Sequence, residues 1–254
     1  MAFPRIQEIT VGTSRSSGLS IPNLTTVPGG KLLEHLLPAA MRSVSRIRSS
    51  SDDPLLVYVV GGLPDITERI KDREYDEIIF PTNKDPDQVS TSIINSIEFF
   101  SKEIIKCYNT FPVFATIGTQ SLETWNTHRH RTRKTKYLLH QHNYNDMQAF
   151  LEHTIHIVNC HIKHINTRHG LITPNYARHI TTDENLDDPS PRGLGRPRYS
   201  RLSDGCHLKS EKNAKWRSHL LDTMQDNREI VSQWSYYPTS YKLAYIAADG
   251  APRQ

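Results

Sequence analysis

The sequence has few cysteines, no long apolar run and no leader-like start. Cys107, Cys160 and Cys206 are odd in number and widely spaced, which argues against a disulfide framework and fits a reducing compartment. No apolar run approaches the roughly 18 residues of a membrane span, and MAFPRIQEIT lacks the basic and apolar regions of a signal peptide. We therefore expect an intracellular protein without membrane insertion.

Acidic residues are missing from one basic stretch, HRHRTRKTK, at residues 128–136. This stretch holds five cations, whereas the net charge of the whole chain is +4, so the remainder of the chain is close to neutral. A concentrated patch of this kind argues for a local contact with an anionic partner.

The chain is long enough to bury a hydrophobic core. It has 254 residues, of which 36% are hydrophobic, and we expect one domain over residues 1–254. Residues 181–198 are rich in Asp, Pro, Gly and Arg and predict an exposed loop insertion. We expect residues 238–254 to form a flexible tail.

Strand-like and helix-like patterns alternate along the chain. The apolar runs typical of strands cover residues 6–12, 54–62 and 111–118. Helical spacing of apolar residues covers 31–47, 87–108, 145–165 and 212–224. This alternation predicts an α/β fold, a three-layer α/β/α sandwich with a mostly parallel sheet, whose ligand site lies at the carboxyl ends of the strands.

Four short segments fall after predicted strands or before predicted helices. They are Gly12-Thr13-Ser14, Pro28-Gly29-Gly30, Gly62-Leu63-Pro64-Asp65 and Asp204-Gly205-Cys206-His207. In this order they resemble the blocks of the SGNH, or GDSL-like, hydrolases, which are a GDS serine, a glycine turn, a GxND segment and a terminal DxxH. The resemblance extends over nearly the whole chain, from the first strand to the last helix.

The resemblance implies a nucleophile and its base. A serine hydroxyl is a poor nucleophile unless a base lies within hydrogen-bonding reach and a third group orients that base. By resemblance, Ser14 attacks the acyl carbon of a small ester or acylated substrate, His207 accepts its proton and Asp204 orients the imidazole. Ser16 and Ser17 are alternative nucleophiles, but only Ser14 aligns with the GDS serine. The implied reaction passes through an acyl-serine intermediate and needs no metal or organic cofactor.

The resemblance also implies how the developing negative charge is held. The backbone N–H groups of Ser14 and of Gly29 or Gly30 would bind the oxyanion, while Gly62 and Asp65 would support the neighbouring loop. These assignments rest on the family pattern alone.

Two residues depart from that pattern. Thr13 stands where the family has Asp, which affects local packing more than proton transfer. Pro64 replaces the asparagine of GxND, whose amide is one oxyanion donor in the family. Because the loss of one such donor elsewhere costs about 100- to 1000-fold in turnover, we expect a slow or specialised esterase.

A group of potential metal ligands occupies one predicted helix. His153, His156, Cys160 and His164 share a face, an arrangement that can bind Zn²⁺. That face lies opposite the apolar stripe of the same helix. We therefore expect a solvent-exposed polar face and no metal site.

The basic stretch supplies a second functional hypothesis. Its cations are Arg129, Arg131, Arg133, Lys134 and Lys136. These residues can meet phosphates without reading sequence, and Trp125 and Tyr137 can stack on bases; a solvated loop is the other interpretation. SGNH folds also serve as non-catalytic RNA-binding domains, and such esterases accompany RNA-binding proteins of some retrotransposons. The alternative function is therefore a non-catalytic module that binds RNA or protein through residues 128–136.

Overall fold

The computed structural model of the chain describes residues 5–16, 19–71, 76–81, 84–134 and 144–234. Ser17, Lys136, Tyr137 and the expected tail at 238–254 lie outside the described residues. Among the described residues, no helix is both long and apolar enough to cross a membrane.

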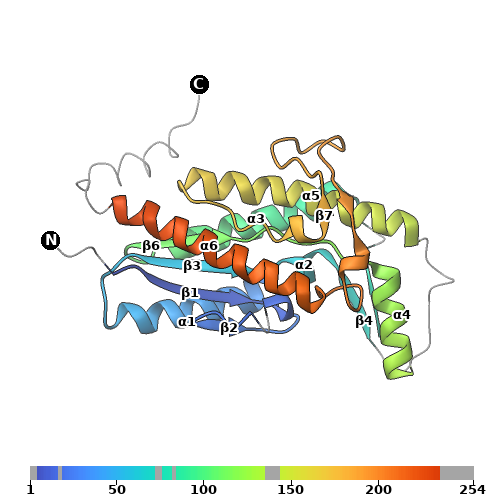
Figure 1. Cartoon of the computed structure of the whole chain (residues 1–254), viewed down its shortest axis with the longest axis horizontal. Coiled ribbons are helices and arrows are strands. Elements are labelled where there is room, and N and C mark those ends of the chain that lie inside the picture. Colours follow the sequence, from blue (N-terminus) through green and yellow to red (C-terminus); the bar gives the residue numbers. More distant parts are fainter. Residues whose placement is uncertain (1–4, 17–18, 72–75, 82–83, 135–143, 235–254) are drawn as a thin grey trace.

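A four-stranded parallel sheet forms the centre of the fold (Figure 1). Its strands are β1 (Gln7–Gly12), β2 (Leu24–Thr26), β3 (Leu55–Val60) and β6 (Thr110–Phe114). They lie in the order β2-β1-β3-β6, and each neighbouring pair is parallel. All six residues of β3 are buried, as its continuous apolar run predicts for a strand with helices on both sides.

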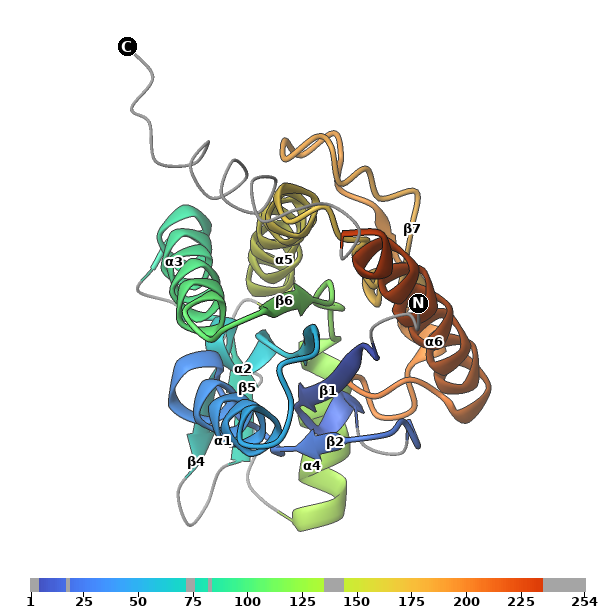
Figure 2. The same ribbon diagram turned by 90° about the vertical axis from the view of Figure 1, so that its left-hand side faces the viewer.

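Helices cover both faces of this sheet (Figure 2). They are α1 (Leu37–Arg48), α3 (Pro86–Ile105), α5 (Tyr144–Arg168) and α6 (Ser210–Trp234). Side chains of β3 alternate between two cores: Leu55 and Val57 pack with α1, α3 and α5, whereas Leu56 and Tyr58 pack with α6. The prediction of a three-layer α/β fold with a mostly parallel sheet is confirmed.

The helix before β3 begins irregularly. Leu32–Leu36 form a π-helical turn, and α1 follows with Pro38 in its first turn. Proline is tolerated there because the first helical N–H groups have no partner within the helix. The helix type changes between Leu36 and Leu37, immediately before Pro38.

Asparagine side chains close the outer edge of β6, the last strand of the sheet. Asn166 on α5 accepts the Phe114 N–H at 3.0 Å and donates to the Phe114 carbonyl at 2.7 Å. Asn159, two turns earlier, makes the same pair with Ile117 at 2.6 and 2.9 Å. Each amide thus replaces the hydrogen bonds that a further strand would make, so the strand edge is buried with its polar groups satisfied.

We expect Asn166→Ala to lower the free energy of unfolding by about 2–4 kcal/mol, because it leaves a buried N–H and a buried carbonyl without partners. Urea denaturation measures this difference. Asn145→Ala, at an exposed position in the first turn of the same helix, is the matched control and should change stability by less than about 0.5 kcal/mol. Equal losses in the two variants would show that the paired amide has no special role.

Several elements lie where the sequence predicted loops. The chain after β3 forms α2 (Leu63–Ile66) and an antiparallel hairpin of β4 (Glu68–Lys71) and β5 (Asp76–Ile79). The basic stretch, expected as a surface loop insertion, is largely helical and belongs to α4 (Leu122–Arg133). Ser121 caps this helix by accepting the Thr124 N–H at 3.2 Å, which explains where it begins.

Residues 181–198 are more structured than an exposed loop. The segment begins with β7 (Thr181–Thr182) and ends with β8 (Arg196–Pro197), which pair in antiparallel fashion. Between them, the Glu184 side chain is only 8% exposed because it contacts α5. The predicted last helix is also longer than expected, since α6 runs ten residues beyond 224.

Candidate active site

Ser14 lies immediately beyond the carboxyl end of β1, in a single 3-10 turn formed by Ser14–Ser16. The turn is anchored on both sides: the Thr13 N–H donates to the Val60 carbonyl at 2.9 Å, and the Ser16 hydroxyl donates to the Thr13 carbonyl at 2.7 Å. Ser16 is fully buried, which separates it from Ser14 as a candidate nucleophile. Thr13 is buried too, so its departure from the family pattern is accommodated by packing.

A tight loop before α6 presents His207. Asp204 Oδ1 accepts the N–H groups of Cys206 at 2.9 Å and His207 at 2.8 Å, and Gly205 takes the positive φ of +86° that closes the loop. Asp204 Oδ2 lies 2.7 Å from His207 Nδ1. Burial alone would raise the pKa of Asp204, but the hydrogen bonds from His207 and Cys206 hold it well below its usual range. Asp204 is therefore ionised at neutral pH.

The two segments meet at a hydrogen bond. His207 Nε2 lies 3.2 Å from Ser14 Oγ, across a sequence separation of 193 residues. When Nδ1 donates to Asp204, Nε2 carries the lone pair that can accept the Ser14 hydroxyl proton. Hydroxyl, imidazole and carboxylate thus form one connected chain, in the order that a serine nucleophile requires.

The buried Arg15 side chain connects the segments that form this site. The side chain is 8% exposed, donates to the carbonyls of Gly118 and, at 3.1 Å, Thr119, and lies 3.6 Å from Cys206 Sγ. One guanidinium therefore connects the turn of Ser14, the segment after β6 and the loop of His207. Sequence reasoning missed Arg15, although a lone cation inside a run of small residues was a signal.

A small cavity opens beside the turn of Ser14. It is lined by Thr13, Gly61, Ile117 and Tyr176, among others, and its volume is about 10 Å³. A space of this size holds about one water molecule.

Of the two glycines expected as alternative oxyanion donors, Gly30 has its N–H in use. The Gly30 N–H donates to the Val27 carbonyl at 3.0 Å within a turn, so it is not available to a substrate. Gly29 is exposed, with a positive φ of +67° and open space around it. Pro64 lies in the first turn of α2, where its missing N–H costs the helix nothing but leaves no donor for an oxyanion.

Asp65 and Gly62 connect the loop after β3 to the start of the first helical segment. Both carboxylate oxygens of Asp65 lie 3.1 Å from the Leu32 backbone nitrogen and accept its N–H. Gly62 has a φ of +109°, and a Cβ there would come within 2.6 Å of Ile117. Only glycine fits this turn without strain.

We expect Asp65→Asn to become more stabilising, relative to the wild type, as pH rises. Burial raises the pKa of Asp65 from 3.8 to about 6, so between these values the folded state binds more protons than the unfolded state. The wild type therefore loses stability as pH rises through this window, whereas an asparagine does not ionise. The difference in unfolding free energy should change by about 1–3 kcal/mol between pH 4 and pH 7. A pH-independent difference would contradict this assignment.

The basic residues of α4 divide into two groups. Arg129 and Arg133 form ion pairs with Asp76. Arg131 and Lys134, which follows the helix, are exposed, and no ion pair is recorded for them within the described residues. These contacts do not test whether the chain binds nucleic acid, so that hypothesis stays a prediction.

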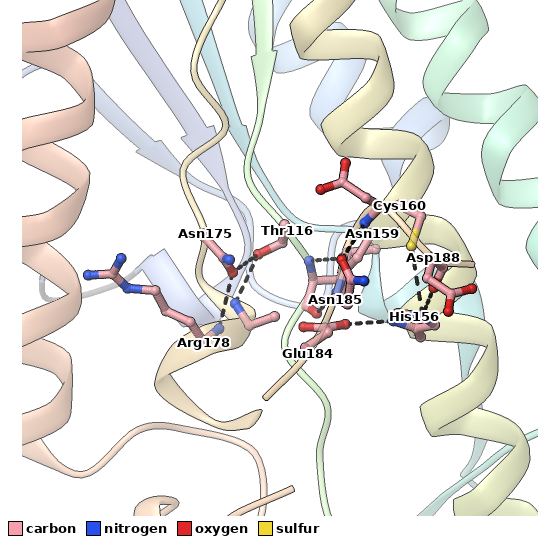
Figure 3. A network of polar contacts seen from close by, with 12 residues as sticks. Thr116, His156, Asn159, Cys160, Asn175, Arg178, Glu184, Asn185 and Asp188 are labelled. Carbon is pink, nitrogen blue, oxygen red and sulfur yellow. Dashed lines mark hydrogen bonds and ion pairs between the residues drawn. The ribbon is translucent and has the colours of Figure 1, made fainter. Parts of the chain in front are cut away.

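The histidine-rich face of α5 is not the solvent-exposed face that was expected. His156 is fully buried, and Figure 3 shows it between Glu184 and Asp188, with Cys160 beside it. Its Nδ1 lies 3.0 Å from Glu184 Oε1 and its Nε2 lies 2.8 Å from the Asp188 carbonyl. Burial alone would lower the pKa of His156, but its contacts with Cys160, Glu184 and Asp188 raise it to about 10. Segment 181–198 therefore packs over this part of the helix, with Glu184 and the Asp188 carbonyl in contact with the two nitrogens of the buried His156 ring.

The other members of this face behave differently. His164 is exposed and His153 is partly buried. Within the described residues, no group of three or more His, Cys, Asp or Glu side chains could hold a metal ion.

Comparisons with known proteins give only distant likenesses. No family model matches the chain, and no curated protein matches it. Its structure is similar to that of a Bacteroides fragilis protein provisionally named an acylhydrolase, with 13% identity and a TM-score of 0.48 over 90% of this chain and 87% of that one. It is also similar to a Streptococcus pneumoniae protein provisionally named a platelet activating factor, with 10% identity and a TM-score of 0.45 over 87% and 84% of the two chains. These likenesses concern the fold alone.

Proposed function

We propose that the chain is a serine ester hydrolase that acts through an acyl-serine intermediate. The observation that carries this proposal is the connected chain of Ser14, His207 and Asp204, with distances of 3.2 and 2.7 Å. A serine and a histidine can be in contact at a protein surface without any catalytic role. Here the imidazole also contacts the Asp204 carboxylate, whose pKa is lowered. The order of roles is therefore complete: nucleophile, base and orienting acid.

The reaction follows from this geometry. Ser14 Oγ attacks the ester carbonyl while its proton passes to His207 Nε2, and the ester C=O becomes a tetrahedral oxyanion. The resulting imidazolium is stabilised by Asp204 and donates its proton to the departing alkoxide, which leaves as the alcohol. Water then attacks the acyl-serine while His207 takes its proton. The imidazolium returns a proton to Ser14 Oγ as the carboxylic acid leaves, which restores the free hydroxyl.

Charge stabilisation is the weak part of this machinery. Pro64 supplies no side-chain amide, and the Gly30 N–H is already hydrogen-bonded, so the N–H groups of Ser14 and Gly29 stay as the expected donors. Removing one oxyanion donor from an efficient enzyme costs about 100- to 1000-fold in turnover. We therefore propose slow turnover, best observed with activated esters.

Trapping the intermediate tests this mechanism. The protein is mixed with 4-nitrophenyl acetate, quenched in acid and analysed by peptide mass spectrometry. The proposal expects an acetyl group on Ser14 that forms before steady-state turnover and disappears once substrate is consumed. Acetylation that is confined to lysine or histidine side chains, with none on Ser14, would contradict it.

A further inference from the structure

Three arginines from two elements surround one carboxylate. Arg69 on β4 lies 2.7 Å from Asp76 through Nε and 3.0 Å through Nη2, Arg133 on α4 lies 2.7 Å from it, and Arg129 lies 3.4 Å from it. Asp76 is only 4% exposed, whereas the side chains of Arg69 and Arg133 are 42% and 45% exposed. The cluster therefore presents its cations to solvent and keeps its anion inside.

One aspartate cannot neutralise three guanidinium groups. Burial alone would raise the pKa of Asp76, but the hydrogen bond from Arg69 and the charges of Arg129 and Arg133 lower it, so its charge is a full −1 at neutral pH. Of the other acids on these elements, Glu68 is exposed on β4, and Glu123 lies in the first turn of α4. Glu77 is buried and accepts a hydrogen bond from Tyr144 at 3.1 Å, and the charge of Asp204 acts on Arg129. The cluster thus keeps a surplus of positive charge at its surface.

The surplus lies next to the candidate active site. The Arg129 guanidinium lies over the Trp125 ring, 5.0 Å from its centre, and the Trp125 ring lies 5.8 Å from the His207 ring, centre to centre. Residues 125, 129 and 133 are four apart, so they line one face of α4. The Trp125 ring therefore lies next to His207, and the arginines follow it along α4.

We propose that this arginine cluster binds an anionic group of the ester substrate, so that the substrates are small esters that carry a sulfonate, phosphate or carboxylate. The inference rests on the proposed function, since it assigns the substrate class of the same site. The reacting ester lies at Ser14, its aromatic or apolar part extends along Trp125, and its anion points towards the arginine cluster, whose charge attracts it. Guanidinium groups suit this role because their paired N–H donors match the oxygens of such anions.

Two aryl acetates test the preference, with kcat/KM for each ester divided by its rate constant for hydrolysis by hydroxide. They are 4-acetoxybenzenesulfonate, which is anionic, and 4-(methylsulfonyl)phenyl acetate, which is neutral. At low salt we expect kcat/KM for the anionic ester to exceed that for the neutral ester at least about 10-fold, and the preference to shrink in about 0.5 M NaCl because salt screens exposed charges. Equal kcat/KM values at low salt would overturn the proposal.

Two charge-removing variants locate the effect. Arg69→Gln and Arg133→Gln each leave two arginines on Asp76, so one of them should fold even if the other does not. Each should lower kcat/KM for the anionic ester at least about 5-fold and leave the neutral ester within about 2-fold. Arg46→Gln, at an exposed position on α1, removes the same charge elsewhere and should not change the preference. A loss in Arg131→Gln equal to that in Arg133→Gln would overturn the local site in favour of a diffuse basic surface that binds polyanions such as RNA.

A binding measurement separates this inference from the proposed function. Isothermal titration with phenyl phosphate, compared with phenol, reports anion binding without any turnover. If no ester is hydrolysed but phenyl phosphate binds the wild type and binds Arg133→Gln at least about 5-fold more weakly, the anion site stands and the esterase proposal fails. If esters are hydrolysed but phenyl phosphate binds no better than phenol, the anion site is overturned and the esterase proposal stands.

Discussion

Ser14→Ala is expected to lower kcat for 4-nitrophenyl acetate by at least about 1000-fold, because it removes the atom that forms the acyl intermediate. The substitution removes a hydroxyl that bonds His207 at 3.2 Å. The fold should survive because the turn itself is held by backbone hydrogen bonds of Thr13. The residual rate would come from binding and from the remaining backbone donors. Steady-state kinetics together with circular dichroism measure both effects.

Ser16→Ala is the matched control for this substitution. Ser16 is two residues away and its buried hydroxyl donates to the Thr13 carbonyl, so its loss should cost stability of about 1 kcal/mol without removing the nucleophile. Its kcat should remain within about 10-fold of that of the wild type. Equal rates in Ser14→Ala and the wild type would show that another group carries the reaction.

Asp204→Asn is expected to lower kcat by about 1000- to 10,000-fold with little change in KM. The new amide oxygen can still accept the N–H groups of Cys206 and His207, so its NH₂ would face His207 Nδ1. That contact makes Nδ1 the acceptor and places the proton on Nε2. His207 would then have no lone pair to take the proton of Ser14, although every heavy atom keeps its place.

Asp222→Asn, an exposed acid on α6, provides the matched control and should leave kcat unchanged within about 2-fold. The pH profile separates the catalytic role of Asp204 from a merely structural one. If the loss reflects the wrong tautomer, the rate should recover partly at high pH, where hydroxide replaces the base. A wild-type kcat in Asp204→Asn would exclude Asp204 as the partner of His207.

The sequence predicts the central layers of this fold well because their signals are local. β1, β3 and β6 are apolar runs that end in glycine or at a turn, and α3 and α5 carry apolar stripes at helical spacing. Such patterns are set by burial on one face or both, and burial is what the structure shows at these positions. The carboxyl ends of the strands could therefore be predicted from the sequence, and Ser14 and the loop of His207 could be expected at the same edge of the sheet.

The missed elements lack that signal. β2 is three partly buried residues, and β4 is mostly exposed, so neither has the apolar alternation of a core strand. The helix α4 has only two buried residues and a strongly polar sequence, so its basic run looked like a loop. It is helical because Ser121 caps it and because Asn126 makes paired hydrogen bonds with Ile78 at 2.8 and 2.9 Å.

The site residues that were missed depend on distant contacts. From the sequence alone, Arg15 is expected to be a surface cation. In the structure it is buried because it donates to the carbonyls of Gly118 and Thr119, which lie more than a hundred positions away in the sequence. The burial of His156 likewise depends on Glu184, which belongs to a segment that its composition marks as an exposed loop. No local pattern encodes either contact, because each needs the tertiary fold before it exists.

Labelling with a serine-reactive fluorophosphonate tests the central claim most directly, since the reagent phosphonylates only a serine activated by its base. The account predicts one label on Ser14, located by peptide mapping, that persists in Ser16→Ala and is lost in Ser14→Ala and greatly slowed in Asp204→Asn. Equal labelling of the wild type and Ser14→Ala, or a label that maps to another residue, would contradict it.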